Sequence, residues 1–364
     1  MSISVRIQHD LGEFRLDARF QTETGVTAIF GRSGSGKTTL INAIAGLLRP
    51  DRGEINLQGR PVFDSARRVN LPAHKRRVGY VFQDARLFPH LNVRQNLRYG
   101  QRFQRRTGLP EQDVIEMLGI GPLLHRHPGA LSGGEKQRVA IGRALLSAPD
   151  ILLMDEPLAA LDAARKEEIL PYLERLRDRA GLPILYVSHA MSEIARLANT
   201  LVLIENGKTR HYGPLSQMLS DPHIAPLIGL REAGAVLKAR VQAHHDDGLT
   251  QLQTAGGALL LPHVRAGLGT ELRIRIHAHE VMLSLERPRD ISALNVLPAT
   301  VQTLRQGDGP GALVRLQCGP DTVLARITRR SAKALQLRPG TACYAIIKSV
   351  SVAQADVGGG QTLR

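Results

Sequence analysis

The sequence has few aromatic residues, few cysteines and no long hydrophobic run. Aromatics make up 4% of its 364 residues and tryptophan is absent, which argues against a surface that stacks sugars or bases. Cys318 and Cys343 lack metal-ligand spacing, so we expect both to be buried in a reducing compartment. No signal-peptide pattern is present, and no apolar run reaches the roughly 18 residues of a membrane-spanning helix. We therefore expect a cytoplasmic protein, soluble or peripheral.

Positive charge is in excess. The formal net charge is +15, and the sequence pI is about 10.5. This balance favours acidic partners, namely nucleic acid, anionic lipid headgroups or small anions. The arginines are scattered rather than clustered, so charge alone leaves these partners open. A hydrophobic content of 43% over this length predicts more than one domain, each with its own core.

The first part of the chain has the pattern of an α/β protein. Continuous apolar runs predict strands that are covered on both faces of a parallel sheet. Helical spacing follows the first run, and a charged amphipathic helix at 166–179 separates the last two, which makes a βαβ unit. The predicted strands are 26–30, 78–82, 151–154 and 184–187.

The pattern changes near Gly229 to short alternating strands with Gly and Pro turns, which is typical of all-β folding. Residues 236–242 resemble 296–302, and Gly-Thr pairs at 269–270 and 340–341 precede comparable strands. We expect two related β units, with chance similarity of short strands as the alternative. The predicted domains are 1–230, with a helical subdomain at about 84–145, then a first β unit or β-rich linker at 231–290, a second β unit at 291–355, and a disordered tail at 356–364.

Gly31-x-x-x-x-Gly36-Lys37-Thr38 follows a predicted strand and opens a helix, the context of a phosphate loop. Its backbone N–H groups and the helix N-terminus attract phosphate. We expect Lys37 to bridge the β- and γ-phosphates of ATP and Thr38 to ligate Mg²⁺. The predicted nucleotide-binding residues of this loop are Gly31, Arg32, Ser33, Gly34, Ser35, Gly36, Lys37, Thr38 and Thr39.

Polar side chains follow three other predicted strands. Carboxyl ends of parallel strands share the edge where ligands bind. We expect Asp155 to hold Mg²⁺ together with Thr38 and Gln83, and Glu156 to act as the general base that polarises water. His189 would hydrogen-bond the γ-phosphate and orient that water. The predicted catalytic residues are thus Glu156, His189 and Gln83.

A second glycine-rich turn, Leu131-Ser132-Gly133-Gly134-Glu135-Lys136-Gln137, opens another predicted helix. One ATP does not need two phosphate cradles from one subunit. We therefore expect this turn to serve an ATP that is held by a partner subunit.

Together these motifs resemble the ATP-binding-cassette ATPases over roughly residues 1–230. The resemblance implies a P-loop NTPase fold and a head-to-tail homodimer that encloses two ATPs. It also implies that the ATP of one subunit is bound in trans by four residues of the other, Ser132, Gly133, Gly134 and Gln137. Ala160-Leu161-Asp162 matches the family's loop linking the two sites, with Ala159 where many members have Ser. It also implies an aromatic that stacks on adenine. Phe14 is our candidate, with Phe20 and plain core packing as alternatives.

Residues 78–90, VGYVFQDARLFPH, are similar to ATPase subunits of molybdate importers. Residues from Ser292 to about Val352 resemble the small OB-like β domain, called Mop or TOBE, that binds molybdate. Short matches at 292–295, 327–331 and 347–349 imply an oxyanion site, for which hydroxyls, N–H groups and a lysine are suitable. Ordinary solvated strand ends are the alternative. The implied ligands are Ser292, Asn295, Ser331, Lys348 and Ser349.

The resemblance also implies partners and a location. A membrane permease dimer would dock on the apolar segment after Gln83, and a periplasmic or extracellular oxyanion-binding protein would take part indirectly. The chain would then lie peripherally on the cytoplasmic face of the cell (inner) membrane, with regulatory molybdate or tungstate. Sulfate or another oxyanion is an alternative cargo. A nucleic-acid-associated ATPase is a further alternative, but the few aromatics and the missing second cassette lead us to expect no nucleic-acid partner.

Overall fold

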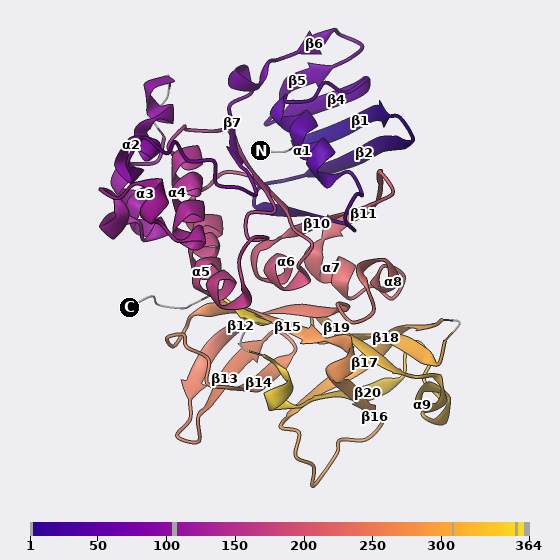
Figure 1. Ribbon diagram of the computed structural model, residues 1–364. Coiled ribbons are helices and arrows are strands. Elements are labelled where there is room, and N and C mark those ends of the chain that lie inside the picture. Colours follow the sequence, from indigo (N-terminus) through magenta and orange to yellow (C-terminus); the bar gives the residue numbers. More distant parts are fainter. Residues whose placement is uncertain (1–2, 104–107, 308, 354–355, 360–364) are drawn as a thin grey trace. The chain divides into compact units, whose positions relative to one another are not determined.

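The computed structural model describes residues 3–103, 108–307, 309–353 and 356–359 (Figure 1). The chain divides into two compact units, Met1–Tyr212 and Gly213–Arg364. The first unit is α/β and the second is mainly β, which confirms the predicted fold classes. The predicted domain boundaries at residues 230, 290 and 355 stay predictions.

The first unit contains an 11-stranded mixed sheet in the order β6-β5-β4-β1-β2-β11-β10-β3-β9-β8-β7. Strands β10, β3, β9, β8 and β7 pair in parallel, whereas β1 pairs antiparallel with β2 and β4. The strands are β1 Ile3–Leu11, β2 Phe14–Thr22, β3 Val26–Phe30, β4 Arg52–Leu57, β5 Arg60–Asp64, β6 Val69–Asn70, β7 Val78–Val81, β8 Ile151–Asp155, β9 Ile184–Val187, β10 Thr200–Glu205 and β11 Lys208–Pro214.

The parallel strands bring four predicted sequence segments to one edge. Every residue of β8 and β9 is buried, as expected for strands covered on both faces. Val187 is paired with Ile29 of β3 on one side and with Asp155 of β8 on the other. The segments that follow β3, β7, β8 and β9 therefore leave the sheet at neighbouring positions.

Six helices and four short 3₁₀ helices accompany the sheet in the described part of this unit. They are α1 Lys37–Ala45, η1 Ala73–Lys75, α2 Val93–Arg98, η2 Gly100–Phe103, α3 Glu111–Leu118, η3 Gly121–Leu123, η4 Pro128–Ala130, α4 Gly133–Leu145, α5 Ala163–Arg179 and α6 Met191–Leu197. Helices α2, α3 and α4 contact one another and α4 contacts β7, and Figure 1 shows them gathered beside that end of the sheet. Helix α5 begins before the predicted Lys166 because Asp162 caps it, accepting a hydrogen bond from Arg165 N at 2.9 Å.

The C-terminal end of the phosphate-loop helix is held by a buried arginine. Arg76 is 1% exposed, and its Nη1 donates to Ala43 O at 2.7 Å and Ile44 O at 3.0 Å. These carbonyls belong to the last turn of α1, where a cation is favourable. Burial lowers the pKa of Arg76 to about 10, so the guanidinium keeps its charge at neutral pH.

The second unit contains two five-stranded sheets, ordered β14-β13-β12-β15-β21 and β16-β20-β17-β18-β19. They share one hydrophobic core. Its elements are α7 Leu215–Leu219, α8 Ala225–Ile228, β12 Gly234–His244, β13 Leu249–Thr254, β14 Gly257–Pro262, β15 Glu271–His277, η5 Ala278–Glu280, β16 Val281–Ser284, β17 Asn295–Gln306, β18 Gly311–Cys318, β19 Asp321–Thr328, α9 Arg329–Ala334, β20 Ala342–Ile347, η6 Ser349–Ser351 and β21 Val357–Gly358.

The predicted internal repeat is confirmed by its hydrogen bonds. Strand β12 has a bulge after Val241, and β17 has one after Val301. Val241 N donates to Thr270 O at 3.0 Å and its carbonyl accepts from Gly269 N at 2.8 Å, while Val301 makes the same pair with Thr341 O at 2.9 Å and Gly340 N at 2.8 Å. The two β units therefore share this backbone arrangement.

The C-terminal segment differs in part from its prediction. Val357 and Gly358 form β21, which pairs with Ile274 and Arg273 of β15, so the predicted disordered tail is wrong for these two residues. Residues 360–364 lie outside the described residues. Cys318 and Cys343 are both buried, as predicted, and burial raises the pKa of Cys318 to about 12.

Candidate nucleotide site

The phosphate loop lies between β3 and α1, and two positions require glycine. Gly36 precedes α1 with a φ of 97°, a conformation that glycine adopts without strain. A Cβ on Gly31 would lie 2.2 Å from Ile204 O, so any side chain there would collide with β10. The loop is thus packed against the sheet while Arg32, Ser33 and Thr38 remain exposed.

Lys37 lies inside this loop. Its Nζ donates to Gly31 O at 2.9 Å and to Arg32 O at 3.1 Å, and it lies 3.9 Å from Glu156 Oε1. Burial lowers the pKa of Lys37, and the charges of Glu156 and Asp155 oppose that shift. Phosphate oxygens can replace the two carbonyl contacts, which gives the ammonium a stronger, charge-assisted interaction.

Asp155 ends β8 beside the phosphate-loop helix. Thr38 Oγ1 donates to its Oδ1 at 3.3 Å, and Tyr80 Oη lies 3.4 Å from its Oδ2. Burial raises the pKa of Asp155, although these two hydroxyls act against the shift. A carboxylate and a hydroxyl are oxygen ligands that suit Mg²⁺, which usually takes one or two carboxylates plus substrate phosphates. The described residues contain no cluster of three or more His, Cys, Asp or Glu placed to hold a metal.

Glu156 follows Asp155 in an unusual backbone conformation. Its φ is 48°, a left-handed value that is uncommon outside glycine, and its N–H donates to Val187 O at 3.0 Å. This turn directs the carboxylate between two predicted partners. Oε1 lies 3.9 Å from Lys37 Nζ and Oε2 lies 3.5 Å from His189 Nδ1. The structure therefore brings Lys37, Thr38, Asp155, Glu156 and His189 together.

Gln83 has no described hydrogen bond to the two carboxylates of this site. It lines a cavity of about 520 Å³ together with Leu87, Pro89, Gly133 and Arg165. In the described part of the chain no hydrogen bond joins Gln83 to Asp155 or Glu156. Its predicted contact with Mg²⁺ or water therefore stays a prediction.

The second glycine-rich turn caps α4. Ser132 and Glu135 form a capping box, in which Ser132 N donates to Glu135 Oε2 at 2.7 Å and Glu135 N donates to Ser132 Oγ at 3.3 Å. Ser132 and Gly133 are exposed. Gly134 is buried, and a Cβ there would lie 2.9 Å from Ile169 Cδ1. Gln137 is 3% exposed and donates to Phe82 O at 3.3 Å, so only the first two of the four predicted residues face outward.

The two aromatic candidates for adenine stacking lie in different surroundings. Phe20 is 1% exposed and belongs to the core, so it offers no free ring face. Phe14 is half-buried beside the phosphate loop, where its ring closely approaches Gly36. The structure thus favours Phe14 over Phe20.

Two polar contacts of the site were not anticipated. Tyr80 Oη lies 3.0 Å from Asn42 Oδ1 as well as near Asp155. Glu193, which is 4% exposed, accepts hydrogen bonds from Ser188 Oγ and Tyr186 Oη at 2.8 Å each. A tyrosine inside a buried apolar strand needs a partner for its hydroxyl. The tyrosines in 78–82 and 184–187 therefore signal that such contacts exist, but not which residues make them.

Glu193 also links the His189 segment to α5. Ser188 Oγ accepts from Ala190 N at 3.0 Å, which closes the turn that carries His189. Lys166 Nζ of α5 donates to Glu193 Oε1 at 2.9 Å. The carboxylate thereby joins β9, α6 and α5 around this turn.

The predicted oxyanion residues do not share one set of contacts. Asn295 is 1% exposed; its Oδ1 accepts from Leu260 N at 2.7 Å, and its Nδ2 donates to Leu260 O at 3.1 Å and Ser349 Oγ at 3.3 Å. Asn295 therefore bridges its sheet to β14. Ser292 and Lys348 are exposed, and no described hydrogen bond joins them to Asn295.

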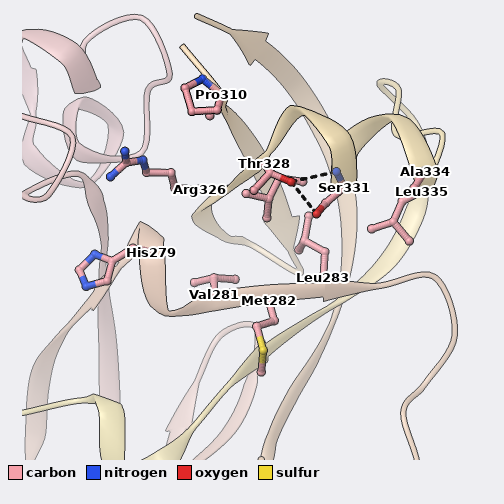
Figure 2. A pocket seen from close by; sticks show the side chains of 12 residues that line it. His279, Val281, Met282, Leu283, Pro310, Arg326, Thr328, Ser331, Ala334 and Leu335 are labelled. Atoms are coloured by element: carbon pink, nitrogen blue, oxygen red, sulfur yellow. Dashed lines mark hydrogen bonds between the residues drawn. The ribbon is translucent and has the colours of Figure 1, made fainter.

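Ser331 lines a separate cavity of about 720 Å³, to which the other four predicted ligands do not contribute. Its Oγ lies 2.8 Å from Thr328 Oγ1, which also caps α9 by accepting from Ser331 N at 3.0 Å. Figure 2 shows this pair across the cavity from Arg326 and His279. The cavity thus combines hydroxyls with cationic or titratable groups.

Comparison with known proteins places these features in a family. Residues 17–159 match the model of the ABC transporter family, and residues 291–354 match the TOBE domain. Together with full-length relatives, this shows that the chain belongs to the ABC transporter family as an ATP-binding ATPase subunit.

Relatives that match almost end to end carry one name, "Molybdenum import ATP-binding protein ModC". The protein of Mesorhizobium japonicum is 50% identical over 100% of this chain and 99% of its own length. That of Rhizobium meliloti is 52% identical over 97% of this chain and 99% of its own. An ATP-binding cassette of an ABC transporter of solved structure is 26% identical, with a TM-score of 0.52, over 62% of this chain and 97% of that one. Among the described residues, none of the helices is both long and apolar enough to span a membrane.

Proposed function

We propose that the chain is the ATP-hydrolysing subunit of a molybdate importer, with tungstate as a possible second cargo. The observation that carries this proposal is the meeting of Lys37, Thr38, Asp155, Glu156 and His189 at one sheet edge. The shared name of the full-length relatives supports molybdate over sulfate or another oxyanion. The TOBE match also favours this transporter over a nucleic-acid-associated ATPase.

In the proposed mechanism, the phosphate loop binds ATP through its backbone N–H groups and Lys37. Mg²⁺, held by Thr38 and Asp155 with a contribution from Gln83, would neutralise phosphate charge. Glu156 accepts a proton from the attacking water, and His189 orients that water against the γ-phosphate.

The strained backbone of Glu156 serves this role because it directs the carboxylate away from β8 and toward His189. Phe14 would stack on adenine from its position beside Gly36.

A homodimer would complete the site. Ser132 and Gly133 are exposed at the N-terminus of α4, where backbone N–H groups can meet the γ-phosphate of an ATP on the partner. Gly134 permits the close packing of α4 on Ile169. Gln137 is expected to act from within its own cassette, by holding Phe82 O and so the segment that leads to Gln83.

A permease dimer is the proposed membrane partner, which would place this subunit on the cytoplasmic face of the inner membrane. Leu87 and Pro89 line the 520 Å³ cavity together with Gln83. An apolar segment of the permease would thus meet residues adjacent to the nucleotide site. A periplasmic or extracellular molybdate-binding protein would deliver cargo to that permease.

The second unit is proposed to bind molybdate or tungstate and to oppose dimer closure when cargo is abundant. The candidate ligands remain Ser292, Asn295, Ser331, Lys348 and Ser349. Because Asn295 and Ser349 contact each other while Ser331 lines another cavity, we expect Ser331 to respond to mutation independently of the other two.

The test is ATPase activity of the assembled transporter in vesicles. We expect ATP turnover to drive molybdate uptake, and added internal molybdate or tungstate to lower turnover while sulfate does not. ATP-driven uptake of sulfate in place of molybdate would assign another cargo. ATPase activity that is stimulated only by DNA or RNA would favour the nucleic-acid alternative. Unchanged turnover with internal molybdate would exclude the regulatory role alone.

A further inference from the structure

Tyr80 of β7 has its hydroxyl against the Asp155 carboxylate. Oη lies 3.4 Å from Asp155 Oδ2 and 3.0 Å from Asn42 Oδ1. The other carboxylate oxygen, Oδ1, accepts from Thr38 Oγ1 at 3.3 Å. Each oxygen of Asp155 therefore has its own hydroxyl neighbour, one from α1 and one from β7.

The position of the Tyr80 ring is fixed by a second aromatic ring. It stacks on Phe82 with a centroid distance of 4.1 Å and an interplanar angle of 24°. The guanidinium carbon of Arg86 lies 4.1 Å from the centroid of Phe82. Rotation of the Tyr80 ring away from Asp155 would break this stack, so the hydroxyl is fixed in place before any ligand arrives.

The hydrogen-bond chemistry favours donation to Asp155. A phenol has one proton and so donates to one acceptor at a time. The Asn42 amide can present Nδ2 instead of Oδ1 to the phenol oxygen, because the two ends of an amide are nearly isosteric. The hydrogen bonds then run from Asn42 Nδ2 to Tyr80 Oη and from Tyr80 Oη to Asp155 Oδ2.

We infer that Tyr80 is a positioning residue that holds Asp155 through Oδ2 and so keeps Oδ1 directed, with Thr38 Oγ1, at the Mg²⁺ of the proposed function. Thr38 can present an oxygen lone pair to the cation and still donate its proton to Oδ1. Tyr80 holds the other carboxylate oxygen, Oδ2, so the two hydroxyls together fix the orientation of the carboxylate. Partners of this kind typically change metal affinity by about tenfold or more when removed.

The test compares two tyrosine substitutions in the full-length protein. Tyr80→Phe removes the hydroxyl and keeps the stacked ring. Tyr186→Phe is the matched control, because its hydroxyl lies on the adjacent strand β9 and donates to Glu193 rather than Asp155. Binding of a fluorescent, non-hydrolysable ATP analogue is followed while Mg²⁺ is titrated, so the readout does not depend on turnover.

We expect Tyr80→Phe to raise the Mg²⁺ midpoint by about tenfold, with Tyr186→Phe near wild type and metal-free affinity equal in all three. Asn42→Ala should shift the midpoint in the same direction by less, and it provides a second reading if Tyr80→Phe folds poorly. Equal midpoints for Tyr80→Phe and wild type, or equal shifts in both tyrosine variants, would overturn the inference alone. If the nucleotide affinity of the wild-type protein did not depend on the Mg²⁺ concentration, the proposed function would be overturned as well.

Discussion

The nucleotide residues of the first unit were predicted from a phosphate loop and from polar side chains that follow buried strands. The oxyanion residues of the second unit were implied by short matches to a molybdate-binding β domain. In the first unit, contacts join Lys37 to Glu156 and Glu156 to His189. In the second, Asn295 contacts Ser349, whereas Ser331 lines a cavity to which neither of these two residues contributes. The residues predicted in the first unit therefore meet at one site, whereas those predicted in the second unit do not all meet.

The difference follows from strand direction. Parallel strands β3, β7, β8 and β9 all end at one edge of the sheet, so whatever follows them must converge. Antiparallel strands end alternately at opposite edges, so a polar residue at a strand end has no prescribed neighbour. In this chain, the predicted residues that follow parallel strands converge, whereas those among the antiparallel strands do not all meet.

Glu156→Gln should give the largest effect and tests the convergent side of this comparison. We expect ATP turnover to fall by about 10² to 10⁴, because the general base is lost, while ATP binding is retained. Steady-state ATPase assays together with nucleotide binding measure this. Glu271→Gln, an exposed carboxylate of the second unit, is the matched control and should turn over as wild type does. If Glu156→Gln kept substantial ATP turnover, another residue would have to be the general base.

Ser132→Arg should give the next largest effect and tests whether the first site is complete within one chain. We expect turnover to fall by roughly 10² through loss of a γ-phosphate contact, with ATP binding largely intact. Ser132→Thr keeps the capping hydroxyl and controls for the helix cap.

Mixed dimers sharpen the result, because the silenced phosphate loop should be the one on the unmodified partner. Silencing of the variant's own loop would contradict contact in trans.

Asn295→Ala tests whether that residue is a ligand or a bridge between sheets. It leaves Leu260 N and O without their partner, which should destabilise the second unit by about 1–3 kcal/mol. Chemical unfolding measures this, and exposed Ser292→Ala should change stability by less than about 0.5 kcal/mol. Unchanged stability with lost molybdate binding would show that Asn295 acts as a ligand and not as a bridge between the sheets.

The pH dependence of the second unit should be the smallest effect. The pKa of His277 is raised, chiefly by its hydrogen bond to Asp356, while burial opposes the shift. Its charged form is therefore favoured in the folded state, so this stabilisation is complete below the unfolded pKa of about 6.5 and is lost as pH rises through the higher folded pKa.

We expect a loss of less than about 1 kcal/mol between pH 6 and pH 8 by thermal unfolding. Asp356→Asn should flatten this difference. The predicted direction would be contradicted if the thermal unfolding midpoint of the wild type rose from pH 6 to pH 8 by more than that of Asp356→Asn.

Much of the nucleotide site was predictable because motif and topology act together. Lys37 and Thr38 are fixed by the phosphate loop, and Asp155, Glu156 and His189 follow buried parallel strands. The Tyr80 and Glu193 contacts could not be assigned, because a side-chain partner across strands depends on register. Likewise, the sequence does not show that Gln137 turns inward to Phe82 O, since helix phase decides which side of α4 it occupies.

The repeat of the second unit was predictable and its partner contacts were not. Paired segments at 236–242 and 296–302 led to two bulged strands with matching hydrogen bonds. The bridge from Asn295 to Leu260 joins residues 35 positions apart, and nothing local predicts such a pairing. β21 was missed because Val357 and Gly358 lie in a glycine-rich stretch, where pairing with β15 outweighs weak intrinsic strand preference.

The strand order of the first unit has a consequence for how the chain is made. β3 carries the phosphate loop, but its neighbours in the sheet are β9 and β10, which end at Val187 and Glu205. A ribosome therefore releases the phosphate loop long before the strands that flank it. Because distant pairings form slowly and nascent domains fold as units, the nascent cassette must remain without a finished nucleotide site until nearly all of its sequence has left the exit tunnel.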